Sequence, residues 1–186
     1  MVSAAKGGIS RTVAAAAIFI YSPGRTADVS DPDSEHDFDA FDHESHVRRA
    51  FDLAREAAAR GDEPFGSVLV RDDSVVMAES NRVVTEDDLR RHPELHLAQR
   101  ACRHSSPAER AETVMYTSTE PCPMCAGGMA RAGFGRVVYS VGGDEIGEFT
   151  GRGASVRSAE VLEGVTEVVG PVLNDEGRAI HEAYGW

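Results

Sequence analysis

Two short motifs constrain the fold more than any other feature of this sequence. The first is H-P-E at residues 92–94 and the second is P-C-P-M-C at residues 121–125. Each stands where a loop ends and a helical pattern begins. The start of a helix presents free N–H groups and the positive end of the helix dipole, which lowers the pKa of a thiol. We therefore expect thiolates at Cys122 and Cys125, beside an imidazole that comes from another helix.

This set of donors is typical of a catalytic zinc site. Two thiolates and the His92 imidazole give three protein ligands, which leaves a fourth position for water. Because two thiolates formally cancel the charge of Zn²⁺, such a site acidifies its water less than a three-histidine site does. A carboxylate that takes the proton from water would make up for this weaker acidification, and Glu94 is the candidate. Glu94 follows His92 by two residues, so both face one cavity only if His92 lies outside regular helix geometry.

The spacing of apolar residues predicts an α/β fold. Helical periodicity covers residues 45–60, 92–104, 122–132 and 173–184. Strand patterns cover residues 66–70, 75–79, 113–117, 137–141 and 165–169. Strands that alternate with helices imply a layered structure with a partly parallel sheet.

The first 44 residues do not resemble part of this domain. Lys6 and Arg11 precede an apolar run at residues 13–21, as in a secretory signal, but no clear cleavage site follows. Residues 28–44 are rich in acidic side chains and hold no lysine or arginine, so we expect a disordered or loosely attached segment. A wrongly assigned start codon, a dispensable tail and an export signal are all compatible with this segment. We divide the chain into an extension, residues 1–44, and a folded domain, residues 45–186.

Composition excludes several classes of protein. The chain has 186 residues, enough for one domain with a core, and no apolar run approaches the roughly 20 residues that span a bilayer. Its 31 acidic residues outnumber 19 basic ones, which argues against a protein that grips nucleic-acid phosphates. Three cysteines do not make a disulfide framework, so we expect a cytoplasmic protein. Lys6 is the only lysine, which fits either a salt-rich (halophilic) cell interior or GC-rich codon usage.

Together the two motifs resemble the zinc nucleobase deaminase signature, H-x-E followed by P-C-x-x-C. The string T-S-T-E-P-C-P-M-C-A-G at residues 117–127 is similar to one branch of the cytidine/deoxycytidylate deaminase superfamily. That branch holds guanine deaminases, fungal cytosine deaminases and tRNA adenosine deaminases. The string P-F-G-S-V-L-V at residues 64–70 also looks like the opening strand of that branch. Asn81 lies eleven residues before His92, where members place a base-binding asparagine. The resemblance covers about residues 45–145.

The resemblance implies a three-layer αβα sandwich around a five-stranded mixed sheet, and a homodimer. It implies hydrolytic deamination of a small purine or pyrimidine base or nucleoside, in which activated water attacks the ring carbon that bears the amino group and ammonia leaves. The implied site consists of the Zn²⁺ ligands His92, Cys122 and Cys125, the proton carrier Glu94, and the base contacts Asn81 and Phe65.

Two departures leave the substrate open. Members of this branch usually have alanine where this chain has Pro93, and a proline has no backbone N–H to donate to a base. Residues 142–186 do not match the C-terminal pattern expected of a guanine deaminase. A tRNA-specific adenosine deaminase is the alternative, but Arg178 stands alone among acidic residues in the last predicted helix. A non-catalytic zinc-binding module is a further alternative, and the presence of Glu94 argues against it.

Several other residues near the motifs carry expectations. Cys102 lies well past the site on its helix, and we expect it in the core. Glu120 either supports the site from behind or only favours the helix start. Gly127 and Gly128 would each cost roughly 1 kcal/mol in a helix relative to alanine, so we expect close helix approach there, within the subunit or across a dimer. His96 follows His92 by four residues, but Pro93 stands where a metalloprotease helix needs glutamate.

Overall fold

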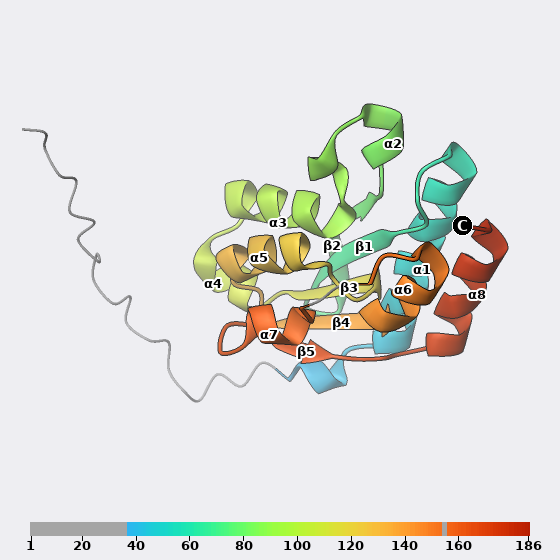
Figure 1. The fold of residues 1–186 in the computed structure, drawn as a ribbon. Coiled ribbons are helices and arrows are strands. Elements are labelled where there is room, and N and C mark those ends of the chain that lie inside the picture. Colours follow the sequence, from blue (N-terminus) through green and yellow to red (C-terminus); the bar gives the residue numbers. More distant parts are fainter. Residues whose placement is uncertain (1–36, 154–155) are drawn as a thin grey trace, which may run out of the picture. The chain divides into compact units, whose positions relative to one another are not determined.

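Five strands form one mixed sheet in the computed structural model, which describes residues 37–153 and 156–186 (Figure 1). The strands are β1 (Gly66–Arg71), β2 (Ser74–Ser80), β3 (Val114–Thr119), β4 (Arg136–Val141) and β5 (Glu167–Val169). Their order is β2-β1-β3-β4-β5. β3, β4 and β5 run parallel, and β1 is antiparallel to both of its neighbours. The predicted fold class, α/β with a five-stranded mixed sheet, is confirmed.

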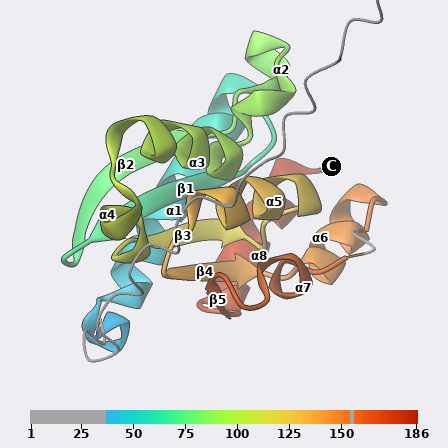
Figure 2. The same cartoon turned by 90° about the vertical axis from the view of Figure 1, so that its left-hand side faces the viewer.

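Successive side chains along the strands pack alternately into two separate cores, one on each face of the sheet. Val68 packs in one core with Tyr116, and Leu69 packs in the other with Met115. Helices α1 (His43–Arg60) and α8 (Asn174–Tyr184) cover the first face. Helices α3 (Pro93–His104) and α5 (Pro123–Ala132) cover the second, with α7 (Ser158–Leu162) beside α5 (Figures 1 and 2). None of the described helices is both long and apolar enough to cross a membrane.

Short helices that the periodicity does not predict lie between these elements. They are η1 (Phe38–Ala40), α2 (Val83–Glu86), η2 (Leu89–Arg91), α4 (Pro107–Ala111) and α6 (Gly143–Thr150), besides α7. Elements of three to eight residues are too short for an apolar stripe to establish a helical period. α4 nonetheless has a signal in the sequence, because Ser106 and Glu109 form a capping box around Pro107 at the first helical position.

The end of the acidic run belongs to the fold, which differs from the expectation of a loosely attached segment. Phe38 is buried in the core between α1 and the sheet, and the Asp39 carboxylate lies 2.6 Å from the Arg136 guanidinium. Asp42 caps α1 by accepting a hydrogen bond from the Ser45 N–H, so this helix begins two residues before the predicted start. The expectations for residues 1–36 lie outside the described residues, and the division at residue 44 stays a prediction.

Cys102 is exposed, so its predicted place in the core is wrong. Helix α3 buries Leu97, Ala98 and Ala101 against the sheet and α5. The residue after Ala101 is turned by about 100° around the helix axis, which takes its side chain off that stripe and into solvent.

Candidate metal centre

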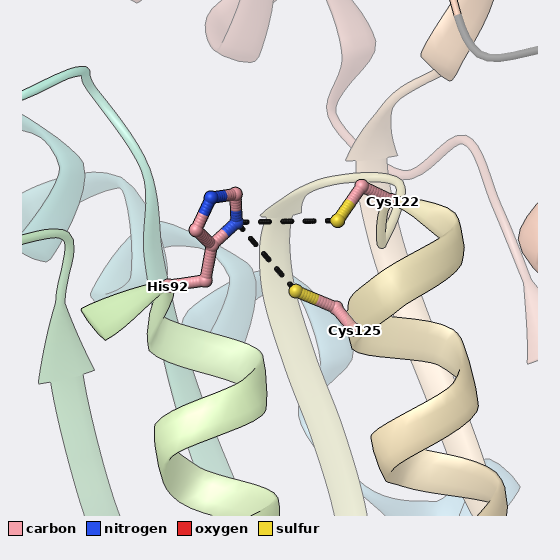
Figure 3. A group of neighbouring side chains, drawn as sticks. All are labelled: His92, Cys122 and Cys125. Atoms are coloured by element: carbon pink, nitrogen blue, oxygen red, sulfur yellow. Dashed lines mark hydrogen bonds between the residues drawn. The ribbon is translucent and has the colours of Figure 1, made fainter. Parts of the chain in front are cut away.

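Each motif places a ligand one residue before a helix, and a proline explains why. Pro93 and Pro123 are the first residues of α3 and α5, where the missing N–H costs nothing. A proline drives the preceding residue toward extended backbone, and His92 has ψ 129° and Cys122 has ψ 161°. Both side chains therefore leave the ends of their helices and point into a shared space (Figure 3).

The three donor atoms have the spacing of a tetrahedral zinc site. His92 Nδ1 lies 3.9 Å from Cys122 Sγ and 3.6 Å from Cys125 Sγ. The donor atoms of His92, Cys122 and Cys125 all lie within 4.8 Å of one another. Zinc–nitrogen and zinc–sulfur bonds of normal length at a tetrahedral angle separate N from S by about 3.6 Å. A zinc ion therefore fits among these atoms without a large movement of the side chains.

Close packing of α3 on α5 brings the two motifs together. A Cβ atom on Gly128 would lie 2.6 Å from Leu95 Cδ1, so only glycine permits this approach without a shift of the leucine. The expected close approach is thus found within the subunit at Gly128. A Cβ on Gly127 would have no described atom within 4 Å. The two neighbouring glycines therefore differ, since only Gly128 faces a side chain of α3.

Glu94 brings a buried carboxylate to the same place. Because His92 is the N-cap of α3 and Glu94 is its second residue, the two side chains line one cavity although they are two positions apart. Thr117 donates its hydroxyl hydrogen to Glu94 Oε1 at 2.9 Å, and the Cys125 thiol donates to Oε2 at 3.5 Å. Burial raises the pKa of Glu94, although the nearby His92 opposes the shift.

The thiols of Cys122 and Cys125 differ in pKa when only protein groups surround them. A hydrogen bond with Cys125 is the largest cause that lowers the pKa of Cys122 to about 4. The same hydrogen bond, followed by burial, raises the pKa of Cys125. The prediction of two thiolates stays a prediction: the protein groups favour the thiolate at Cys122, whereas at Cys125 it requires the positive charge of a bound cation.

A cavity of about 110 Å³ opens beside these residues. Its floor is formed by His92, Glu94 and Cys122. Its outer wall, as we use the term here, consists of five residues from α6 and from the chain that follows it: Gly143, Ile146, Arg152, Val156 and Arg157. Phe65 also lines the cavity, as expected of a base contact.

Asn81 and His96 lie close to the site without lining this cavity. Asn81 is fully buried, and its Oδ1 accepts a hydrogen bond from the Val83 N–H. Its Nδ2 has no hydrogen-bond partner within the described part of the chain. His96 lies 3.3 Å from the Glu79 carboxylate, consistent with the expected polar helix position, and is not one of the three clustered donors.

Glu120 connects the second motif to the outer wall, and its role goes beyond favouring a helix start. Its side chain is 4% exposed. Oε2 accepts a hydrogen bond from the Gly143 N–H, and Oε1 accepts hydrogen bonds from the Ser158 N–H and hydroxyl and from Arg157 Nε. Burial raises the pKa of Glu120, but hydrogen bonds from Gly143 and Arg157 outweigh burial and lower it. No sequence pattern links Glu120 to Arg157, which lies 37 residues away.

Comparison with known proteins identifies the family to which these features belong. The family model for MafB19-like deaminases matches residues 41–168. A probable cytosine deaminase of Schizosaccharomyces pombe is 28% identical over 149 residues, which cover 75% of this chain and 90% of that protein. A tRNA-specific adenosine deaminase of Bacillus subtilis is 29% identical over 133 residues, covering 72% of this chain and 82% of that protein.

A solved structure shares the fold. A guanine deaminase from Nitrosomonas europaea superposes with a TM-score of 0.68 at 23% identity, over 76% of this chain and 84% of that one. The matched residues 41–168 include both motifs, the outer wall and all of the sheet except Val169. The chain therefore belongs to the MafB19-like deaminase family, within the cytidine deaminase-like superfamily that the two motifs resemble.

Proposed function

We propose that this chain is a zinc-dependent hydrolytic deaminase, which replaces the amino group of a purine or pyrimidine base or nucleoside with an oxo group. His92, Cys122 and Cys125 would hold zinc, and Glu94 would move the proton. One observation carries the proposal: an imidazole nitrogen and two sulfurs stand at tetrahedral spacing, beside a buried carboxylate on the same cavity. Membership in a deaminase family supports the reaction type.

The proposed mechanism assigns the proton to Glu94. When bound, zinc supplies a Lewis acid at whose open fourth position water is activated. Thr117 occupies Oε1 of Glu94, and the Cys125 thiol would release Oε2 on losing its proton to metal binding, so Oε2 is the oxygen proposed to take the proton from water. Burial raises the pKa of this carboxyl, which favours holding the proton until it passes to the leaving amino nitrogen. The water oxygen bonds to the ring carbon, the carbon–nitrogen bond breaks, and ammonia leaves.

Two residues are proposed to orient the ring, and a third limits which rings can bind. Phe65 offers an apolar ring at the side of the cavity. The unpaired Nδ2 of Asn81 supports a hydrogen bond to an acceptor on the base, because a buried donor without a partner is costly. Pro93 has no N–H to give, so the substrate is one whose binding needs no donor at residue 93.

We also propose that the enzyme is a homodimer. The open space beside Gly127 supports this proposal, because it leaves room for a second copy against that face of α5. Light scattering on purified protein tests it. We expect twice the 20.0 kDa mass of one chain, and a mass of one chain at all concentrations contradicts the proposal.

A tRNA-specific adenosine deaminase is the second candidate, and similarity to the Bacillus subtilis enzyme over most of its length favours it. The charge of the last helix opposes it. Arg178, the basic residue of α8 besides His181, is already paired with Glu145 at 2.8 Å, so it is not free to contact phosphates. Transfer RNA therefore belongs among the substrates to be tested.

The test is ammonia release from a panel of compounds. The panel holds guanine, cytosine and adenine, their nucleosides, and a tRNA that carries adenosine at the wobble position. We expect ammonia from at least one base or nucleoside, loss of the reaction with a chelator, and recovery with zinc. Glu94→Ala should retain zinc and release no ammonia. Activity that survives both metal removal and Glu94→Ala, or ammonia from tRNA alone, contradicts the proposal.

A further inference from the structure

An ion pair joins two segments that stand on either side of the cavity. Arg152 lines the cavity as part of the outer wall, and its Nη2 lies 2.8 Å from Glu63 Oε1. Glu63 comes two residues before Phe65, which lines the cavity from the other segment. The two charged residues are 89 positions apart in the sequence. Nothing in the proposed chemistry uses this pair, so it invites a separate explanation.

The buried carboxylate of Asp62 anchors the loop that carries Glu63. Asp62 is fully buried in the loop between α1 and β1. Its Oδ1 accepts hydrogen bonds from the Val84 and Thr85 N–H groups, and its Oδ2 accepts from the Thr85 hydroxyl and from Arg60 Nε. Four donors on one buried carboxylate fix the loop to α2, because breaking any of them leaves a buried charge poorly paired. Glu63 therefore presents its charge from an anchored position.

Glu120 holds the outer wall at both of its ends. Glu120 binds the Gly143 N–H at one end and Arg157 and Ser158 at the other. Arg152 lies between these anchors, and its side chain is 73% exposed. Its guanidinium is tied to the opposite side of the cavity through Glu63. The carboxylate of Glu120 is therefore a buried anchor of the wall, whereas Arg152 is an exposed one.

We propose that the Glu63–Arg152 pair is a latch across the mouth of the cavity that favours a free base over its nucleoside. The proposal rests on the proposed function, because it names the substrate class of the same site. A cavity of about 110 Å³ lies well below the roughly 300 Å³ at which pockets for larger ligands begin. On this proposal a ring system occupies the cavity, and an attached ribose leaves it past Arg152 and separates that residue from Glu63.

The test compares each base with its own nucleoside. The probes are guanine with guanosine and cytosine with cytidine, and the readout is the ratio of kcat/KM for nucleoside to kcat/KM for base. An exposed ion pair contributes little, so we expect Arg152→Gln and Glu63→Gln each to raise this ratio by about two- to fivefold. The reversed pair, Glu63→Arg with Arg152→Glu, should bring the ratio back toward the wild-type value. Salt at 1 M should raise the ratio in wild type and not in the double Gln variant.

A matched control is available on another surface. Arg48 forms an ion pair with Glu176 at 2.9 Å, and neither residue lines the cavity, so Arg48→Gln should leave the ratio unchanged. A ratio that does not move in either single variant overturns the latch. A loss of nucleoside activity in Arg152→Gln also overturns it, because Arg152 would then be a binding group for the sugar. If wild type deaminates nucleosides and none of the bases, the latch is overturned while the proposed function stands; if it releases ammonia from neither, the proposed function itself fails.

Discussion

The floor and the outer wall of the cavity are built in different ways. The floor residues His92 and Cys122 sit at the starts of two long helices packed on one face of the sheet, and apolar burial fixes those helices. The outer wall is held by charged groups that are far apart in the sequence, chiefly Glu120 with Arg157 and Glu63 with Arg152. Packing of the two helices fixes the positions of the floor residues together, whereas each ion pair or hydrogen bond of the wall can be removed on its own. We infer that the chemistry belongs to the floor and that substrate choice belongs to the wall.

The largest expected effect is at the proposed metal ligands, which comprise His92 and Cys122 of the floor and the buried Cys125 behind them. Cys125→Ser removes a buried sulfur donor, so we expect loss of zinc and of ammonia release to background. Cys102→Ser is the matched control, since Cys102 is exposed on α3 and outside the cluster. Metal analysis and the ammonia assay measure both variants. A Cys125→Ser protein with one zinc per chain and wild-type rate would mean that the floor is not a metal centre.

Glu94→Gln tests the proton carrier apart from the metal. The amide keeps the shape and the hydrogen bond from Thr117 but does not accept the proton of water. We expect kcat to fall by about two to four orders of magnitude, with zinc content unchanged. Single-turnover ammonia release together with metal analysis distinguishes the two quantities. A kcat within tenfold of wild type would remove Glu94 from the mechanism.

Glu120→Ala should show how strongly the wall depends on one carboxylate. The change leaves Arg157 and two buried N–H groups without their acceptor, so we expect unfolding free energy to fall by roughly 2–3 kcal/mol, allowing for the partial exposure of Arg157. KM should rise more than kcat falls, and zinc should remain. Urea denaturation and steady-state kinetics measure these effects. Glu109→Ala, in an exposed capping box, should lower stability less and leave KM unchanged.

A smaller effect concerns the aromatic cluster behind the wall. The ring of His181 packs against the rings of Phe65, Phe149 and Trp186, and its side chain is buried. Burial, helped by Arg178, lowers the pKa of His181 to about 4. The folded state therefore binds fewer protons than the unfolded state, so stability is full above pH 6.5 and is lost as the pH falls toward 4.

The difference between two denaturation curves isolates this histidine. From pH 7 to pH 5 the wild type should lose about 2 kcal/mol more unfolding free energy than His181→Phe, because phenylalanine does not titrate. All other titrating groups are common to both proteins. Equal pH slopes for the two proteins would show that His181 does not keep a depressed pKa in the fold.

The sequence predicts the floor well and the wall poorly, for physical reasons. Apolar periodicity over ten or more residues locates α1, α3, α5 and α8, and the strands follow from runs of β-branched residues. The prolines after His92 and Cys122 mark the helix starts that bring the ligands together. These signals are local, so they can be read along the chain.

The wall leaves no such local signal. Its residues 143–157 hold several glycines and charges and no apolar stripe, so α6 is not predicted. The ties of Glu120 to Arg157 and of Glu63 to Arg152 join positions 37 and 89 residues apart, and a single sequence shows no pattern that pairs them. The prediction for Cys102 fails for a different reason. Its residue type favours the core, but its position lies off the buried stripe of α3.

The most direct test of the central claim is X-ray absorption at the zinc edge of the zinc-loaded protein. His92, Cys122 and Cys125 should give a shell of two sulfur atoms at about 2.3 Å and two lighter atoms at about 2.0–2.1 Å, one from the imidazole and one from solvent. The lighter shell should change when a substrate base is added. A shell with a third sulfur, a fourth protein ligand, or no bound zinc at all would contradict the assignment of an open catalytic centre.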